Sequence, residues 1–419
     1  MISSTGTAPK IFFVSNVWPE PDSSAAGRHM LQLLESLHRS GSEIVFGCTS
    51  APSAFMSETV RQLCRLEQLR MNCSSIDTLV KQLKPDIVVF DRFMAEEQFG
   101  WRVREAAPDA ACVLNTEDLH FIRRWRGSTK PGTDYSFTEI SYETFQTDDA
   151  RRELASIFRC DLSLLMSEAE LQIISQFIPQ MKPLLHYHPL CESADNVSDS
   201  LQQNLSFNCI SLGNFLHKPN QDAAQVLIQD IWPALRRELN GAELHLYGAY
   251  ATEKTLRWSE PHNGIQVKGR AAELTACLNG HRLLLAPIRF GAGLKGKLLD
   301  AMRHGLPFVT TPIGIEGIDE PENCPDFVAF NRDDFIRKAA TLYQDDGLRK
   351  RFRLWAAEVL RNKFDAQQHE TALLSQLSQL MRDLRQIREK NITGGILRHH
   401  TMASTRYMGK WIEEKNRRS

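Results

Sequence analysis

RLLLAPIRFGAGLKGKLLDAMRHGLPFVTTPIGIEGI, residues 282–318 of the 419-residue chain, predicts a strand, a glycine-rich loop, a helix, a second strand and a second loop. The apolar run 283–288 forms the first strand, and three glycines with two lysines follow it. Apolar residues at helical spacing follow at 298–302, Gly305 predicts the end of the helix, and residues 308–311 form the second strand. This order places free backbone N–H groups at a helix N-terminus, where the helix dipole favours a phosphate.

The glycine loop has the spacing of a dinucleotide-binding motif. Gly291, Gly293 and Gly296 spell G-x-G-x-x-G, and Glu316 follows at about the distance of a ribose-binding acid. In dinucleotide folds the glycines follow a strand directly and usually belong to the first strand–helix unit. Here residues 287–290 intervene, and the stretch lies in the second half of the chain. A dinucleotide site is therefore disfavoured.

The same loop matches two other kinds of phosphate site. Residues 291–297 spell all but the last position of a magnesium P-loop, but Leu298 replaces the Ser or Thr whose hydroxyl holds the metal. A nucleotide-sugar diphosphate site uses the same glycines and lysine, together with an acid inside the helix and a second glycine loop. Asp300 and residues 314–317 supply both, so this third interpretation is favoured.

The whole motif resembles the donor-binding segment of retaining glycosyltransferases with the GT-B fold, of the family 4 type. In that family a strand ending in Pro precedes Gly-x-Gly-x-Lys, Glu-Ala-Met, Gly-x-Pro, another strand and Gly-x-Glu-Gly. The corresponding segments here are Pro287, Gly291-Ala292-Gly293-Leu294-Lys295, Asp300-Ala301-Met302, Gly305-Leu306-Pro307 and Gly314-Ile315-Glu316-Gly317. Two positions depart from the family. Asp300 replaces a Glu, and Ala292 stands at the first of two glutamates that many members carry with seven residues between them.

The resemblance implies roles for individual residues. Those expected to bind the donor diphosphate are Arg289, Gly291, Gly293, Lys295, Gly314 and Gly317. Asp300 would bind the nucleotide ribose, while Gly269 and Arg270, after the predicted strand 265–268, would bind the base, largely through backbone groups. No metal or other cofactor is expected, because preorganised cations and helix N–H groups stabilise the charge that grows on the leaving diphosphate.

Composition is compatible with a two-domain enzyme. A chain of 419 residues is too long for one small hydrophobic core, so two domains are expected. With 50 Lys and Arg against 51 Asp and Glu, the chain has no excess of positive charge for binding nucleic acid. Nine cysteines without a C-x-x-C pair indicate a reduced compartment rather than a disulfide framework or a zinc site. No apolar run reaches the ~20 residues that a membrane-spanning helix needs, and residues 1–10 lack the basic start of a signal peptide. We therefore expect a cytoplasmic protein, at most peripheral at a membrane.

Strands and helices alternate through the first half of the chain. The expected strands are residues 11–15, 44–48, 87–90, 111–114 and 158–166, and the expected helices are residues 28–40, 60–69 and 76–83. This spacing predicts a parallel, doubly wound sheet with ligands at the carboxyl ends of its strands. Four charged residues follow one of these strands, and a helix cap and surface charges also explain them: Asp91, Arg92, Glu96 and Glu97. Ser167 and Glu170 fit a capping box of the helix after the last strand.

A polar cluster follows the predicted strand 111–114. Asp118, His120 and Arg123 form the pattern Asp-x-His-x-x-Arg, which packing alone does not require. The pattern resembles the N-domain signature of the same glycosyltransferases. By that resemblance His120 would face the transferred sugar and Asp118 would orient it or the acceptor, so the expected catalytic residues are His120, Asp118 and Lys295.

Two further segments of the N-terminal half have both a functional and a structural interpretation. The loop with Ser24, Gly27 and Arg28 resembles the small-residue loop that GT-B enzymes place between donor and acceptor, and an ordinary loop with a Ser cap explains it equally well. The basic run 123–126, with Arg151 and Arg152 beside it, is typical of a solvated face. The more specific interpretation is a binding site for an acceptor that carries a phosphate, such as a lipid-linked sugar.

Five segments are expected along the chain. Residues 1–193 form an N-terminal, acceptor-side Rossmann-like domain, the polar residues 194–206 a linker, and residues 207–365 a donor-binding domain. Residues 366–390 form an amphipathic helix, which in GT-B folds crosses back onto the N-terminal domain. Residues 391–419 are a basic tail, interpreted as a solvated or partly helical extension, with membrane-surface contact as the alternative.

The expected fold is α/β, with two Rossmann-like doubly wound domains facing a cleft. The expected function is transfer of a sugar, with retention, from a nucleotide diphosphate-sugar to an unknown glycan, lipid-linked or other acceptor in glycan, polysaccharide or glycolipid biosynthesis. Two alternatives stay open: a sugar-nucleotide epimerase of the same fold, and a non-catalytic nucleotide-sugar-binding subunit. Ala292 and Asp300 are the residues that suggest the second.

Overall fold

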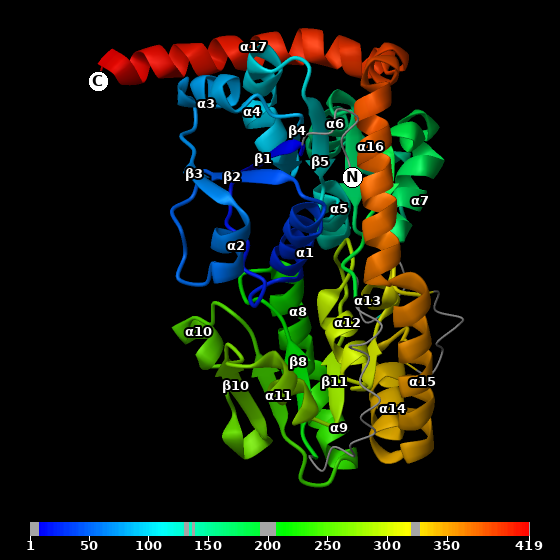
Figure 1. Ribbon diagram of the computed structural model, residues 1–419. Helices are drawn as coiled ribbons and strands as arrows, with labels where there is room; N and C mark the ends of the chain where they lie inside the picture. The colour runs from blue at the N-terminus through cyan, green and yellow to red at the C-terminus, as the bar shows by residue number, and fades with distance from the viewer. Residues whose placement is uncertain (1–7, 130–133, 136–138, 193–206, 320–326, 419) are drawn as a thin grey trace.

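The molecule consists of two α/β domains, one above the other in Figure 1, each built on a parallel sheet. The computed structural model describes residues 8–129, 134–135, 139–192, 207–319 and 327–418. The expected linker, residues 194–206, lies outside the described residues.

The N-terminal domain contains a seven-stranded parallel sheet in the order β3-β2-β1-β4-β5-β6-β7. Its strands are β1 (Lys10–Ser15), β2 (Glu43–Cys48), β3 (Arg65–Gln68), β4 (Ile87–Asp91), β5 (Ala111–Asn115), β6 (Leu162–Leu165) and β7 (Leu185–Tyr187). Its helices are α1 (Ala25–Arg39), α2 (Glu58–Leu63), α3 (Ser75–Leu83), α4 (Phe93–Ala106), α5 (His120–Thr129), α6 (Asp148–Arg159) and α7 (Glu168–Phe177). Helices cover both faces of the sheet, so its central strands are almost continuously apolar and buried.

The second domain contains a five-stranded parallel sheet in the order β10-β9-β8-β11-β12. Its strands are β8 (Cys209–Leu212), β9 (Leu244–Tyr247), β10 (Ile265–Gly269), β11 (Leu283–Ala286) and β12 (Phe308–Thr310). Its helices are α8 (Lys218–Val226), α9 (Trp232–Glu238), α10 (Glu253–Leu256), α11 (Leu274–Asn279), α12 (Gly296–Arg303), α13 (Pro312–Ile315), α14 (Arg332–Gln344) and α15 (Asp346–Lys363). The strand order reverses between β1 and β4 in the first sheet and between β8 and β11 in the second, and ligands bind at such switch points.

Two long helices end the chain on the N-terminal domain. Helix α16 (Ala366–Lys390) rises from the second domain along the first (Figure 1) and buries Leu373, Leu377 and Leu380 in the core that contains β1. Helix α17 (Ile392–Arg418) then lies across the end of the N-terminal domain that faces away from the second domain. No helix among the described residues is long and apolar enough to span a membrane.

Three predicted boundaries differ from the structure by three residues or more. The predicted helix 60–69 was wrong in its second half: α2 ends at Leu63, and the polar sequence RLEQ forms the edge strand β3, whose exposed position does not require apolar residues. The predicted strand 158–166 was too long, because α6 extends to Arg159 and β6 begins at Leu162. Helix α1 begins at Ala25 rather than at Arg28, because Ser24 caps it.

Candidate functional site

A cleft of about 1190 Å³ lies between the two domains, at the carboxyl ends of their strands. The N-terminal domain contributes the loop after β1, the first turns of α1, and the residues after β4 and β5. The second domain contributes the loops after β8, β9, β10 and β11 and the start of α12. The sequence predicted both halves of this arrangement.

The glycine loop, residues 291–296, and the N-terminus of α12 line the cleft from below. Lys295 Nζ donates to the carbonyl oxygens of Gly293 and Ala292, and Lys297 Nζ donates to Asn220 Oδ1 over 2.7 Å. Burial lowers the pKa of both ammonium groups; for Lys297 burial, together with the nearby charge of Lys295, lowers the pKa to about 7. Two crowded cations at a helix N-terminus, bonded to neutral oxygens, form a site that an anion would stabilise.

Glycines are required where this loop meets the N-terminal domain. A Cβ atom on Gly293 would lie 2.7 Å from Asp118 Cβ, and Gly293 has φ +67°, a backbone conformation that L side chains rarely adopt. A Cβ atom on Gly296 would lie 2.5 Å from Ala25 Cβ. The glycine spacing in the sequence therefore serves close contact between the domains as well as access to a phosphate.

His120 and Asp118 line the opposite wall of the cleft. His120 begins α5, and its Nε2 lies 3.3 Å from Asp118 Oδ1, while Arg123 forms an ion pair with the same carboxylate. Burial lowers the pKa of His120 to about 4, although Asp118 opposes this effect, so the ring is neutral at pH 7. The ring's Nδ1 is buried and has no hydrogen-bond partner among the residues that the structure describes. The expected catalytic residues His120, Asp118 and Lys295 thus surround one cleft.

Glu170 contradicts the predicted capping box. Ser167 makes no side-chain capping hydrogen bond, and Glu170 Oε1 accepts the backbone N–H of Leu119 and that of Gly293, each over 2.8 Å. One carboxylate oxygen therefore binds both domains at once. Burial, with Asp118 nearby, raises the pKa of Glu170 to about 8. The sequence pattern was misleading because Ser-x-x-Glu at a helix start is also the signature of a local cap.

Arg126 was also misassigned as part of a solvated or phosphate-binding basic run. Its guanidinium is buried and binds Glu316 and the carbonyl oxygen of Gly291, all across the domain boundary. Arg124 instead pairs with Asp149 at the surface. Nothing in the sequence RRWR, residues 123–126, distinguishes Arg124 from Arg126, because the partners of both lie in distant segments of the chain.

The expected ribose acid and the expected N-terminal loop meet in the cleft. Arg28 forms an ion pair with Asp300, and Arg303 Nη2 lies 3.7 Å from the same carboxylate. Ser24 Oγ accepts the N–H of Gly27 over 3.0 Å, which satisfies the start of α1. Both interpretations of the loop are therefore compatible with its geometry. The guanidinium of Arg270, expected at the base, donates to Ser23 Oγ over 2.9 Å and lines the cleft.

Four expected site residues lie outside the cleft as the described residues form it: Gly269, Arg289, Gly314 and Gly317. The Arg289 guanidinium points to Asp222, with Nε 2.9 Å from Oδ2 and Nη2 2.5 Å from Oδ1. Gly314 packs against Thr310, whose hydroxyl would lie 1.9 Å from an added Cβ atom. Gly317 has φ +82° and packs against Ser167. These glycines are explained by packing and turn geometry.

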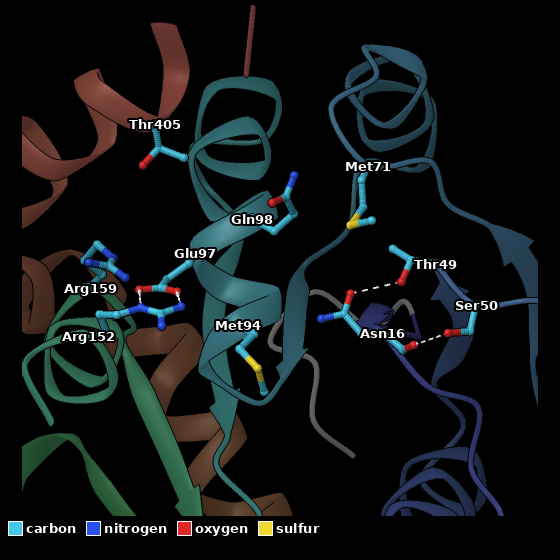
Figure 2. A pocket seen from close by; sticks show the side chains of 10 residues that line it. All are labelled: Asn16, Thr49, Ser50, Met71, Met94, Glu97, Gln98, Arg152, Arg159 and Thr405. Atoms are coloured by element: carbon cyan, nitrogen blue, oxygen red, sulfur yellow. Dashed lines mark hydrogen bonds and ion pairs between the residues drawn. The ribbon is translucent and has the colours of Figure 1, made fainter. Parts of the chain in front are cut away.

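The four charged residues after β4 divide into two groups. Asp91 and Arg92 line the cleft, whereas Glu96 is fully buried against Arg159 and Glu97 pairs with Arg152. Glu97 and Arg152 belong to a second, smaller hollow of about 630 Å³ on the N-terminal domain. In Figure 2, Asn16, Thr49 and Ser50 lie on one side of this hollow, and Glu97 and Arg152 lie on the other. Thr405 of α17 lies at its upper edge. Of the four charged residues after β4, surface charge therefore explains only Glu97.

The titratable residues do not group as metal ligands. Within the described ranges, no cluster of three or more His, Cys, Asp or Glu side chains could hold a metal ion. The eight cysteines that the structure describes as free thiols are dispersed, and most of them are buried.

Comparison with known proteins agrees with this architecture. Residues 206–345 match the family described as Glycosyl transferases group 1. Several solved structures superpose on both domains. The chain has the GT-B fold. Anabaena HepE, in complex with UDP and glucose, has a TM-score of 0.64 and 15% identity and covers 89% of this chain and 100% of its own.

Two other structures show the same likeness. Sucrose-phosphate synthase from Thermosynechococcus elongatus has a TM-score of 0.66 and 13% identity, over 90% of this chain and 99% of its own. TarM has a TM-score of 0.64 and 9% identity, over 90% of this chain and 100% of its own. No curated protein sequence matches the chain significantly. At these identities the structural likeness concerns the fold.

Proposed function

We propose that this protein is a glycosyltransferase that binds a nucleotide diphosphate-sugar in the cleft and transfers the sugar, with retention, to an acceptor held on the N-terminal side. The observation that carries the proposal is the pair Lys295 and Lys297 at the N-terminus of α12, facing His120 and Asp118 across the cleft. The family match over residues 206–345 and the UDP and glucose complex of the similarly folded HepE support it.

The reaction breaks the bond between the anomeric carbon and a diphosphate oxygen and joins that carbon to the acceptor's hydroxyl oxygen. The hydroxyl proton leaves to the departing diphosphate or to water. Negative charge grows on the diphosphate in the transition state, so cations that contact it lower the barrier more than they strengthen ground-state binding. We assign this role to Lys295, Lys297 and the backbone N–H groups of the glycine loop other than that of Gly293, which donates to Glu170.

His120 and Asp118 act on the sugar side in this proposal. Because the His120 ring is neutral and lines the cleft, it can contact the sugar without placing a second positive charge near the anomeric carbon. Asp118 fixes the ring through Nε2. Asp300 would bind the ribose by sharing its carboxylate with Arg28, and Arg270 would lie near the base. Arg289 has no diphosphate role here because its guanidinium is paired with Asp222.

The test is a screen of UDP-, ADP-, GDP- and dTDP-sugars for binding and for slow hydrolysis, with products followed by NMR. The proposal predicts that one nucleotide class binds and that the sugar is first released with its original anomeric configuration. An epimerase would instead convert the nucleotide sugar with no acceptor present. Binding without any turnover, both alone and with added acceptor sugars, would identify a non-catalytic subunit, and no binding by any of these donors would refute the proposal.

A further inference from the structure

Helix α17 presents a row of large apolar side chains to solvent. Fifteen large apolar residues are exposed within the described ranges, and five of them lie on this 27-residue helix: Ile392, Ile396, Tyr407, Met408 and Trp411. Four of the five, at positions 392, 396, 407 and 411, are separated by about one or three helical turns and therefore share one face. Trp411 is 61% and Tyr407 70% exposed.

The opposite face of α17 is fixed to the N-terminal domain. Asn391 Nδ2 donates to the carbonyl oxygen of Phe158 over 2.7 Å, and Arg398 pairs with Asp161. Farther along, the Glu413 carboxylate accepts hydrogen bonds from Arg102 Nη2 and from the Ser74 N–H, each over 3.2 Å. Gly409 lets the helix approach Trp101, because an added Cβ atom would lie 3.2 Å from that ring. The helix is therefore held in place, and its apolar row points away from the domain.

Cations accompany the apolar row. Lys410 and Lys415 are exposed next to Trp411, and Lys415 Nζ lies 5.4 Å from the centre of the Trp411 ring. The whole chain has a net charge of −1, whereas α17 has six Lys or Arg residues against two Glu residues. Trp and Tyr with flanking lysines favour the boundary between lipid headgroups and acyl chains. A single helix face with flanking lysines suits a lipid surface better than a protein interface, which usually buries about 800 Å² on each partner.

We propose that the outer face of α17 docks the protein on an anionic membrane surface, with the helix axis parallel to the bilayer. The aromatic side chains enter the headgroup region, and Lys410 and Lys415 bind lipid phosphates. Because α17 lies at the end of the N-terminal domain that faces away from the second domain (Figure 1), the docked enzyme holds its N-terminal domain against the membrane and leaves the second domain on the far side.

Vesicle sedimentation with the full chain tests this docking surface. Wild type should sediment with phosphatidylcholine vesicles that contain about 30% phosphatidylglycerol. A smaller fraction of it should sediment with pure phosphatidylcholine vesicles or at higher salt. Tyr407→Ser/Trp411→Ser should lower the bound fraction at least about fivefold through lost apolar burial. Lys410→Glu/Lys415→Glu should lower it only on the anionic vesicles.

Leu354→Ser is the matched control, because Leu354 is 64% exposed on α15 in the other domain and its loss should leave binding unchanged. Three results would overturn the proposal: wild type that stays in the supernatant with anionic vesicles, an equal loss in the control, or a wild-type dimer that the Tyr407/Trp411 variant makes monomeric. The last would show that a second copy covers the row. Donor binding by each variant, measured in parallel, keeps a failure here separate from a failure of the proposed glycosyl transfer.

Discussion

Arg126 and Glu316 form a buried ion pair that joins the two domains, with Nη2 2.6 Å from Oε1 and Nη1 2.7 Å from Oε2. The arginine side chain is 2% exposed and the glutamate 8%. Burial alone would raise the pKa of Glu316, but Arg126 outweighs this and lowers it. Since Arg126 Nη1 also donates to the carbonyl oxygen of Gly291, the arginine fixes the glycine loop relative to α5.

Removal of one member of this pair should be more damaging than removal of both. Arg126→Met leaves a buried carboxylate unpaired, which costs about 3–5 kcal/mol. Arg126→Met/Glu316→Met removes both charges and should recover much of that loss. Urea unfolding followed by circular dichroism measures the two variants. A single variant within about 1 kcal/mol of wild type would contradict a structural role for the pair.

Substitution of Gly293 should disrupt the contact between the two domains. An alanine there adds backbone strain of at least about 1 kcal/mol and places its Cβ atom against Asp118. We expect lower thermal stability and weaker donor binding, measured by melting curves and calorimetry. Gly395→Ala is the control, because Gly395 lies in α17 with open space around its Cβ position. If both variants bind the donor as wild type does, the contact between the domains is not needed for the site.

Donor affinity should fall as the pH rises through about 7. The Lys297 ammonium has its pKa lowered to about 7, mainly by burial and also by Lys295, and an anion binds best to the protonated form. Binding should therefore be accompanied by proton uptake that is largest near and above pH 7. Calorimetry of a nucleotide sugar, whose diphosphate does not titrate in this range, in buffers of different ionisation enthalpy measures this uptake. Lys297→Gln should bind more weakly and with a flatter pH profile, whereas an unchanged profile would assign the titration to another group.

Glu170 should make the folded protein less stable as the pH rises. Its pKa is raised from 4.5 to about 8 in the folded chain, so the folded state binds more protons than the unfolded state between these values. Its contribution to stability is present below about pH 4.5 and is lost as the pH approaches 8. Unfolding free energies at several pH values should show a smaller decline for Glu170→Gln than for wild type. An identical decline would mean that Glu170 does not titrate in this window.

Local patterns, together with the resemblance that they carry to GT-B glycosyltransferases, predicted the fold and the residues that meet at the cleft, while the roles of those residues stay predictions. The spacing of strands and glycines predicted two parallel sheets, and Lys295, His120 and Asp118 do line one cleft. These predictions succeeded because each depends on short-range order: a strand end, a glycine turn, and a helix start next to it.

Contacts between the domains could not be predicted in the same way. Glu170 lies 123 residues from Gly293 and Arg126 lies 190 residues from Glu316, so nothing in their local sequence distinguishes them from a cap or a surface charge. For Arg289 the sequence instead predicted a place in the site that the structure does not give it. It adjoins the glycine loop in sequence, but its guanidinium is paired with Asp222 and lies outside the cleft.

Donor turnover by Lys295→Ala tests the proposed function most directly. Lys295 is half-buried and bonds to carbonyl oxygens, so its loss should change the unfolding free energy by no more than about 1 kcal/mol. Loss of a cation that stabilises the leaving diphosphate should lower turnover by about 10²–10³-fold. Steady-state turnover of the nucleotide sugar that the screen identifies should therefore fall by that factor in a variant that remains folded. Equal donor turnover in wild type and Lys295→Ala would contradict the proposed site.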